Sequence, residues 1–151
     1  MVMEQEIRRF KFNGESVLSL PARPEAFATL CNWLDNIAAE LQLVPKTHNQ
    51  LLIVADEIFT NISSYGYPSG DGDACVAVDF DMTNEILTIT FIDSGMPYNP
   101  LDTPPPDINA PLEEREIGGL GIFLVRNLMD SVEYTRENDC NVLILKKRIS
   151  R

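Results

Sequence analysis

Two polar residues whose side chains could take part in a reaction or bind a metal, Glu57 and Asn61, lie four positions apart in one segment of this chain. The apolar residues around them recur every three or four positions, which is typical of a helix with one buried side. At about 100° per residue, both side chains fall on the same edge of that side, one turn apart. Such a pair suits a hard cation held by the amide oxygen, beside a carboxylate that acts as acid or base. A solvated helix edge is the simpler interpretation of the pair taken alone. The apolar residues of this stripe are Leu51, Val54, Ala55, Ile58, Ile62 and Tyr65.

A second site of interest is Asp93, which follows an apolar run and precedes Ser94 and Gly95. A carboxylate at the end of a buried strand can accept a hydrogen bond from the exocyclic amine of adenine. Gly95 would then let the base lie flat against the backbone. A plain Asp-Ser-Gly turn is the alternative interpretation of the same residues.

The third site is the glycine-rich stretch Gly119-Leu120-Gly121, directly before the apolar helix expected at 122–129. The amides of a helix start can hold phosphate oxygens. The stretch is neither a dinucleotide fingerprint nor a P-loop, because the strand, the third glycine and the Gly-Lys-Ser/Thr of those motifs are missing. Glycines used only for close packing are the alternative.

Length, charge and cysteine content exclude several classes of protein. The 151 residues are expected to form a single domain, and 12 basic against 23 acidic side chains give a net charge of −11, which disfavours direct nucleic-acid binding. No segment is long and apolar enough for a membrane span, and the charged N-terminus is unlike a signal peptide. The three cysteines, Cys31, Cys75 and Cys140, are interpreted as small buried residues in a reducing compartment. We therefore expect a cytoplasmic protein.

The order of expected elements predicts an α+β fold. Alternating apolar residues, together with turn residues between the runs, predict mostly antiparallel strands. The apolar sides of the expected helices must be buried, and one face of the sheet can bury them. The result would be a two-layer sandwich with a mixed, mostly antiparallel sheet covered on one face by helices. Between 95 and 118 there is no periodicity, and six of the chain's ten prolines fall there, which is typical of a lid or binding loop. Strands are expected at 6–12, 17–20, 74–81, 86–92, 132–136 and 142–149, and helices over 24–41, 47–65 and 122–129.

Taken in order, these motifs resemble those of the Bergerat-fold ATPases, the superfamily that includes the ATP-binding domains of histidine kinases. The shared order is an E-x-x-x-N helix, D-x-G after a strand, a long loop, and G-x-G at a helix start. Within the superfamily, 93–100 and 119–122 look most like the bacterial anti-sigma-factor serine/threonine kinases of partner-switching systems. The resemblance covers about 23–147, nearly the whole chain.

The resemblance implies a role for each matching residue. Asn61 would be the Mg²⁺ ligand, with the metal bridging the phosphates of ATP, and Glu57 would be the general base that takes the proton of an attacking hydroxyl. Asp93, with Gly95 beside it, would read adenine. Gly119, Leu120 and Gly121 would face the phosphates, and 95–118 would be the ATP lid. Arg115, the only basic residue of that loop, would compensate charge on the γ-phosphate.

One departure concerns the last strand, where the family commonly has a Gly-Thr pair that helps to hold adenine. Cys140 and Asn141 stand there in this chain. Asn141 could substitute as both donor and acceptor, so we take it as a candidate cofactor-binding residue.

The resemblance also implies the partners: a STAS-domain anti-anti-sigma protein as phosphate acceptor, a sigma factor as a bound target, and a second copy of the chain in a homodimer. Two alternatives stay open at this point. One is a nucleotide-sensing module that binds a partner without significant kinase activity. The other is a stand-alone ATPase in which Glu57 activates water, since the same base and metal serve both reactions.

Overall fold

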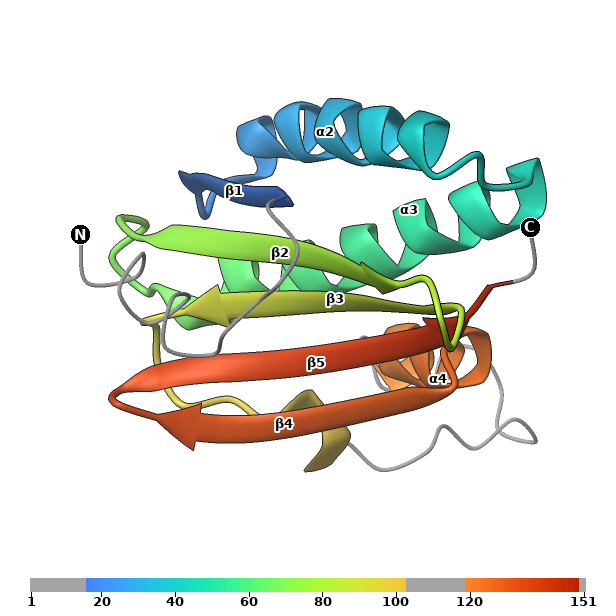
Figure 1. The fold of residues 1–151 in the computed structure, drawn as a ribbon. Coiled ribbons are helices and arrows are strands. Elements are labelled where there is room, and N and C mark those ends of the chain that lie inside the picture. Colours follow the sequence, from blue (N-terminus) through green and yellow to red (C-terminus); the bar gives the residue numbers. More distant parts are fainter. Residues whose placement is uncertain (1–15, 103–118, 150–151) are drawn as a thin grey trace, which may run out of the picture.

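The computed structural model describes residues 16–102 and 119–149, which form a five-stranded sheet with helices packed on one face (Figure 1). The strands lie in the order β1-β2-β3-β5-β4, and every neighbouring pair is antiparallel. The expected α+β sandwich is confirmed, with no parallel pair among the described strands. The strands are β1 (Ser16–Pro21), β2 (Asp73–Asp81), β3 (Ile86–Asp93), β4 (Ser131–Glu137) and β5 (Cys140–Arg148); the helices are α2 (Phe27–Glu40), α3 (Pro45–Asn61) and α4 (Gly119–Leu128), with short turns η1 (Pro24–Ala26), η2 (Ile62–Gly66) and η3 (Pro100–Asp102).

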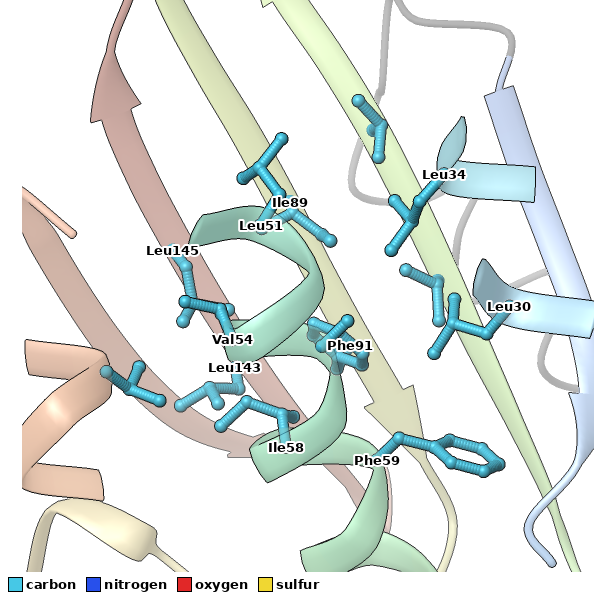
Figure 2. Packing of buried hydrophobic residues seen from close by; sticks show 14 of the residues in the cluster. Leu30, Leu34, Leu51, Val54, Ile58, Phe59, Ile89, Phe91, Leu143 and Leu145 are labelled. Carbon is cyan, nitrogen blue, oxygen red and sulfur yellow. The ribbon is translucent and has the colours of Figure 1, made fainter. Parts of the chain in front are cut away.

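The core lies between the sheet and the helices, and α3 occupies its middle. Figure 2 shows Val54 and Ile58 of α3 directed at the sheet, where Phe91 of β3 lies. Burying one such side chain contributes roughly 1.5–3 kcal/mol, so the apolar stripe fixes α3 against the strands. The same packing holds the polar edge of the helix in a constant position. Other buried members of this cluster are Leu30, Leu34, Leu51, Ile89, Val125, Leu143 and Leu145.

The end of α3 differs from the expectation. The helix continues after Asn61 as a single π-turn, η2, whose wider winding changes the direction of the side chains that follow. Tyr65, expected in the buried stripe, is therefore 51% exposed. Gly66 at the end of η2 is buried, and from Tyr67 the chain leaves the helix.

Two helix starts also differ. The helix expected from residue 47 begins two residues earlier, as α3 with Pro45 in its first turn, and Val44 at the N-cap makes no side-chain bond. The last helix begins at Gly119 rather than after Gly121, so the glycines form its first turn. The strand expected at 6–12 lies outside the described residues.

The other face of the sheet carries a smaller apolar cluster that includes Cys75, Cys140 and Val142. No disulfide joins the three cysteines; Cys31 is half-buried, and Cys75 and Cys140 are buried. Within 16–102 and 119–149, no helix combines the length and the apolar character that crossing a bilayer requires.

Candidate functional site

A cavity opens where the C-terminal end of α3 meets the ends of β3 and β5. The space between its walls is about 400 Å³ when the adjoining open solvent is counted, and only about 30 Å³ of it admits the centre of a water-sized sphere. Its apolar wall continues the core, and Figure 2 shows three of its residues, Ile58, Phe91 and Leu143. Polar groups enter from Asn61 and Asp93, two of the residues singled out in the sequence. The complete lining is Ile58, Asn61, Ile62, Gly66, Phe91, Asp93, Tyr98, Pro100, Tyr134, Asn141 and Leu143.

Asp93 is the last residue of β3, and its side chain is only 4% exposed. Its Oδ1 accepts hydrogen bonds from the Gly95 amide and from Asn141 Nδ2, both at 2.9 Å. Burial raises the pKa of Asp93, while these two bonds and the positive charge of Arg136 oppose the rise. No described residue donates to Oδ2, which leaves one carboxylate oxygen available to a ligand in the cavity.

Asn141 lies opposite Asp93 in the register of β3 and β5 and is 6% exposed. Besides Asp93, its Nδ2 donates to the Met96 carbonyl at 2.8 Å. Its Oδ1 accepts from the Tyr98 amide at 3.2 Å and from the Tyr134 hydroxyl. The residue lines the cavity, as a cofactor-binding residue would, but the protein itself already occupies its polar atoms.

Gly95 has a packing role that its position in the sequence did not indicate. A Cβ on Gly95 would lie 2.4 Å from the Gly66 carbonyl oxygen, so the missing side chain allows the loop after β3 to pack on η2. The Met96 amide donates to that same carbonyl at 2.8 Å, and Arg136 donates to the Gly95 carbonyl at 2.8 Å. Gly66, not Gly95, lines the cavity.

Glu57 lies one turn before Asn61 and faces the start of α4. A Cβ on Gly121 would lie 1.9 Å from Glu57 Oε2, so the carboxylate occupies the space that a side chain there would need. Burial, and then the charge of Asp56, raise the pKa of Glu57. A half-buried carboxylate with a raised pKa is suited to accept a proton.

The structure therefore brings the expected residues together in two adjoining groups. Asn61, Asp93 and Asn141 line the cavity, whereas Glu57 and Gly121 lie beside it, joined to Asn61 by one turn of α3. The backbone of Gly119 and Leu120 forms the first turn of α4. Arg115 and most of the expected lid, 103–118, lie outside the described residues.

Sequence reasoning did not single out eight of the eleven lining residues as site residues, among them Gly66, Tyr98 and Tyr134. Tyr98 lies in the loop after β3, and its ring is 5.5 Å from that of the exposed Tyr65. The available signal was the alternation of β4, which places Tyr134 on the helix side of the sheet, the side on which Asp93 and Asn141 lie. Nothing local in the sequence marks Gly66 or Tyr98 as cavity residues.

The donor set fits a magnesium nucleotide better than a metal held by protein alone. Among the described residues, no group of three or more His, Cys, Asp or Glu side chains is placed to hold a metal ion. Mg²⁺ keeps several waters and is usually bound by one or two protein oxygens together with phosphates. The Asn61 amide at the cavity edge can supply such an oxygen, and the open Oδ2 of Asp93 fits an amine on a flat base.

Comparison with known proteins decides the family. The family model for the histidine kinase-like ATPase domain matches residues 20–147, most of the chain. The chain belongs to the histidine kinase-like ATPase family. This match confirms the resemblance to histidine kinase ATP-binding domains that the three sequence motifs indicated.

Among members of the family, the chain is 26% identical over 133 residues to the serine-protein kinase RsbW of Bacillus mycoides, covering 85% of this chain and 82% of the relative. It is 27% identical over 113 residues to the serine/threonine-protein kinase BtrW of Bordetella bronchiseptica, covering 75% and 79%. Relatives of this histidine kinase-like ATPase thus include protein kinases that act on serine or threonine.

Solved structures agree on the fold. The RsbU and RsbW domains of a Mycobacterium tuberculosis protein superpose with a TM-score of 0.63 at 16% identity, over 89% of this chain and 33% of the other, so this chain spans about a third of that protein. The SiaB–SiaC complex of Pseudomonas aeruginosa gives a TM-score of 0.58 at 14% identity, over 97% and 95%. Both support the histidine kinase-like ATPase architecture.

Proposed function

We propose that this protein is an ATP- and Mg²⁺-dependent protein serine/threonine kinase that also acts as an anti-sigma-type regulator. One observation carries the proposal: Asp93 and Asn61 line one cavity, and Glu57 lies one helical turn further, against the glycine-rich start of α4. In this proposal Asp93 recognises the adenine base, Asn61 binds the metal, and Glu57 acts as the general base, all toward one bound nucleotide.

Each residue has a chemical task in this proposal. Asp93 Oδ2 accepts a hydrogen bond from the exocyclic amine of adenine. This bond selects ATP over GTP, because guanine has a carbonyl at that position. Apolar side chains of the cavity, such as Ile58 and Phe91, cover the faces of the base. Asn61 supplies an amide oxygen to Mg²⁺, which when bound would neutralise charge on the phosphates.

The transfer step assigned to Glu57 is a proton transfer. Its carboxylate takes the proton of the serine or threonine hydroxyl as that oxygen attacks the γ-phosphorus and ADP leaves. The amides of Gly119, Leu120 and Gly121 at the start of α4 would hold phosphate oxygens. Arg115 is proposed as the lid residue that compensates the developing charge.

The phosphate acceptor is proposed to be a STAS-domain anti-anti-sigma protein, and the bound target a sigma factor. The kinase names of RsbW and BtrW support the acceptor chemistry. The solved structure that contains RsbU and RsbW domains shares the fold of this chain. A homodimer and a cytoplasmic location complete the proposal.

The test is transfer of label from γ-³²P-ATP to STAS-domain proteins of the same genome. We expect label on a serine or threonine of one such protein, in a magnesium-dependent reaction. Glu57→Gln is expected to keep ATP binding and to lower the transfer rate at least about 100-fold. Glu40→Gln, an equivalent change at the exposed end of α2, is the matched control and should transfer at the wild-type rate. Release of free phosphate without labelled protein would instead show a hydrolase, and full activity of Glu57→Gln would exclude Glu57 as the base.

A further inference from the structure

The amide of Asn141 has only one orientation compatible with its neighbours. The Tyr98 amide can only donate a hydrogen bond, so Oδ1 must face it at 3.2 Å. The Met96 carbonyl can only accept, so Nδ2 must face it at 2.8 Å. The Tyr134 hydroxyl adds a second donor on the Oδ1 side. The second hydrogen of Nδ2 then points at Asp93 Oδ1, 2.9 Å away.

This orientation leaves Asn141 no polar group for a ligand. Both of its N–H hydrogens and both acceptor positions of Oδ1 are occupied by protein groups. Because the side chain is 6% exposed, its contribution to binding must pass through the residues that it contacts. The sequence-based expectation of a direct contact between Asn141 and adenine therefore does not match its bonding.

The effect of Asn141 falls on Asp93. With the Gly95 amide also on Oδ1, that oxygen has two donors, and no described residue donates to Oδ2. The carboxylate can therefore not rotate without breaking both bonds, and it presents one fixed acceptor to the cavity. The same side-chain amide also binds the backbone of Met96 and Tyr98, near the start of the long loop after β3, and so holds that backbone in a fixed position relative to the Asp93 carboxylate.

We infer that Asn141 is a positioning residue for base selection: it fixes Asp93 so that Oδ2 reads a base amine, and it ties the beginning of the loop at 95–98 to that carboxylate. The inference rests on the proposed nucleotide function. It predicts that Asn141 controls discrimination between bases rather than affinity for the phosphates.

The test compares two nucleotides that differ only in the amine, ADP and purine riboside 5′-diphosphate. By titration calorimetry in magnesium, the wild-type protein is expected to prefer ADP by about tenfold or more, the effect of one hydrogen bond to a charged group. Asn141→Ala should reduce that preference to less than about threefold, with little change in affinity for the purine riboside nucleotide. Asn36→Ala, at an exposed position of α2, is the matched control and should keep the wild-type preference.

A purely structural role would weaken both nucleotides equally, which would overturn the inference, as would an unchanged preference in Asn141→Ala. If the alanine variant does not fold, Tyr134→Phe removes one donor to Oδ1 without emptying the site. This variant should lose part of the preference, and an unchanged preference there contradicts the inference. A wild-type protein that binds neither nucleotide would overturn the proposed function itself, a distinct result.

Discussion

At the scale of single residues, Glu57 combines three properties that its position in the sequence only partly indicates. It is half-buried, it lies beside Asp56, and its carboxylate fills the space above Gly121. The first two raise its pKa, and the third fixes its place relative to the start of α4. Two measurements follow, one from the raised pKa and one from the contact with Gly121.

The first measurement is the pH dependence of phosphate transfer. A general base must be ionised, so the rate should fall as the pH is lowered through the raised pKa of Glu57. Asp56→Asn removes one cause of the rise and should move this acidic limb to lower pH, by less than about one pH unit, with the same rate on the plateau. Glu40→Gln, remote from the site, should not move the limb. A limb that stays in place in Asp56→Asn would contradict the assignment of Glu57.

The second measurement concerns Gly121. Its alanine variant would place a Cβ 1.9 Å from Glu57 Oε2, so the flexible carboxylate has to move. Because displacement of a reacting group by about 1 Å can cost about 100-fold, we expect a similar loss in transfer rate. The melting temperature should change little, since alanine favours a helix over glycine. Asn127→Ala, exposed in the same helix, should retain activity, and full transfer by Gly121→Ala would contradict this geometry.

At the scale of elements, the contact between the loop after β3 and the π-turn η2 closes one side of the cavity. Gly95 lies so near the Gly66 backbone that a Cβ would approach the carbonyl oxygen to 2.4 Å. Backbone cannot move aside as a side chain can, so Gly95→Ala should lower the free energy of unfolding by about 1–3 kcal/mol. Urea denaturation measures this directly. Met96→Ala, an exposed side chain next to it, should have near wild-type stability; equal stability of the two variants would contradict the close contact.

The elements themselves were largely predictable from local patterns. The alternation in β2 and β3 and in β4 and β5 was enough to place both hairpins, and the stripe from Leu51 to Ile62 placed α3. Tyr65 was misplaced because a π-turn, which ends at Gly66 where Gly95 packs against it, interrupts the helical period. The order of the strands, with β5 between β3 and β4, also depends on contacts that no local pattern contains.

The site was predictable to a smaller extent, because part of it depends on contacts between residues far apart in the sequence. Asn61 and Asp93 could be selected because each lies in a motif of a few residues, and both line the cavity. The network around Asn141 joins Asp93, Tyr98 and Tyr134, and its bond to Asp93 spans 48 positions of the chain. Such bonds follow from the register between β3 and β5, which only the folded sheet defines.

At the scale of the whole molecule, the proposed ligand and the protein are both negatively charged. A net charge of −11 gives no general attraction for a triphosphate, so affinity has to come from local donors and the metal. The apolar cavity, one open carboxylate oxygen and the start of α4 are the local features that the fold provides. The account therefore depends on a single nucleotide that spans all three features.

The most direct test of this claim is a crystal structure of the protein with Mg²⁺ and a non-hydrolysable ATP analogue. The account predicts the base in the cavity with its amine on Asp93 Oδ2, the metal on Asn61, and the γ-phosphate near Glu57 at the start of α4. A nucleotide bound elsewhere, or a base in the cavity whose amine faces away from Asp93, would contradict it.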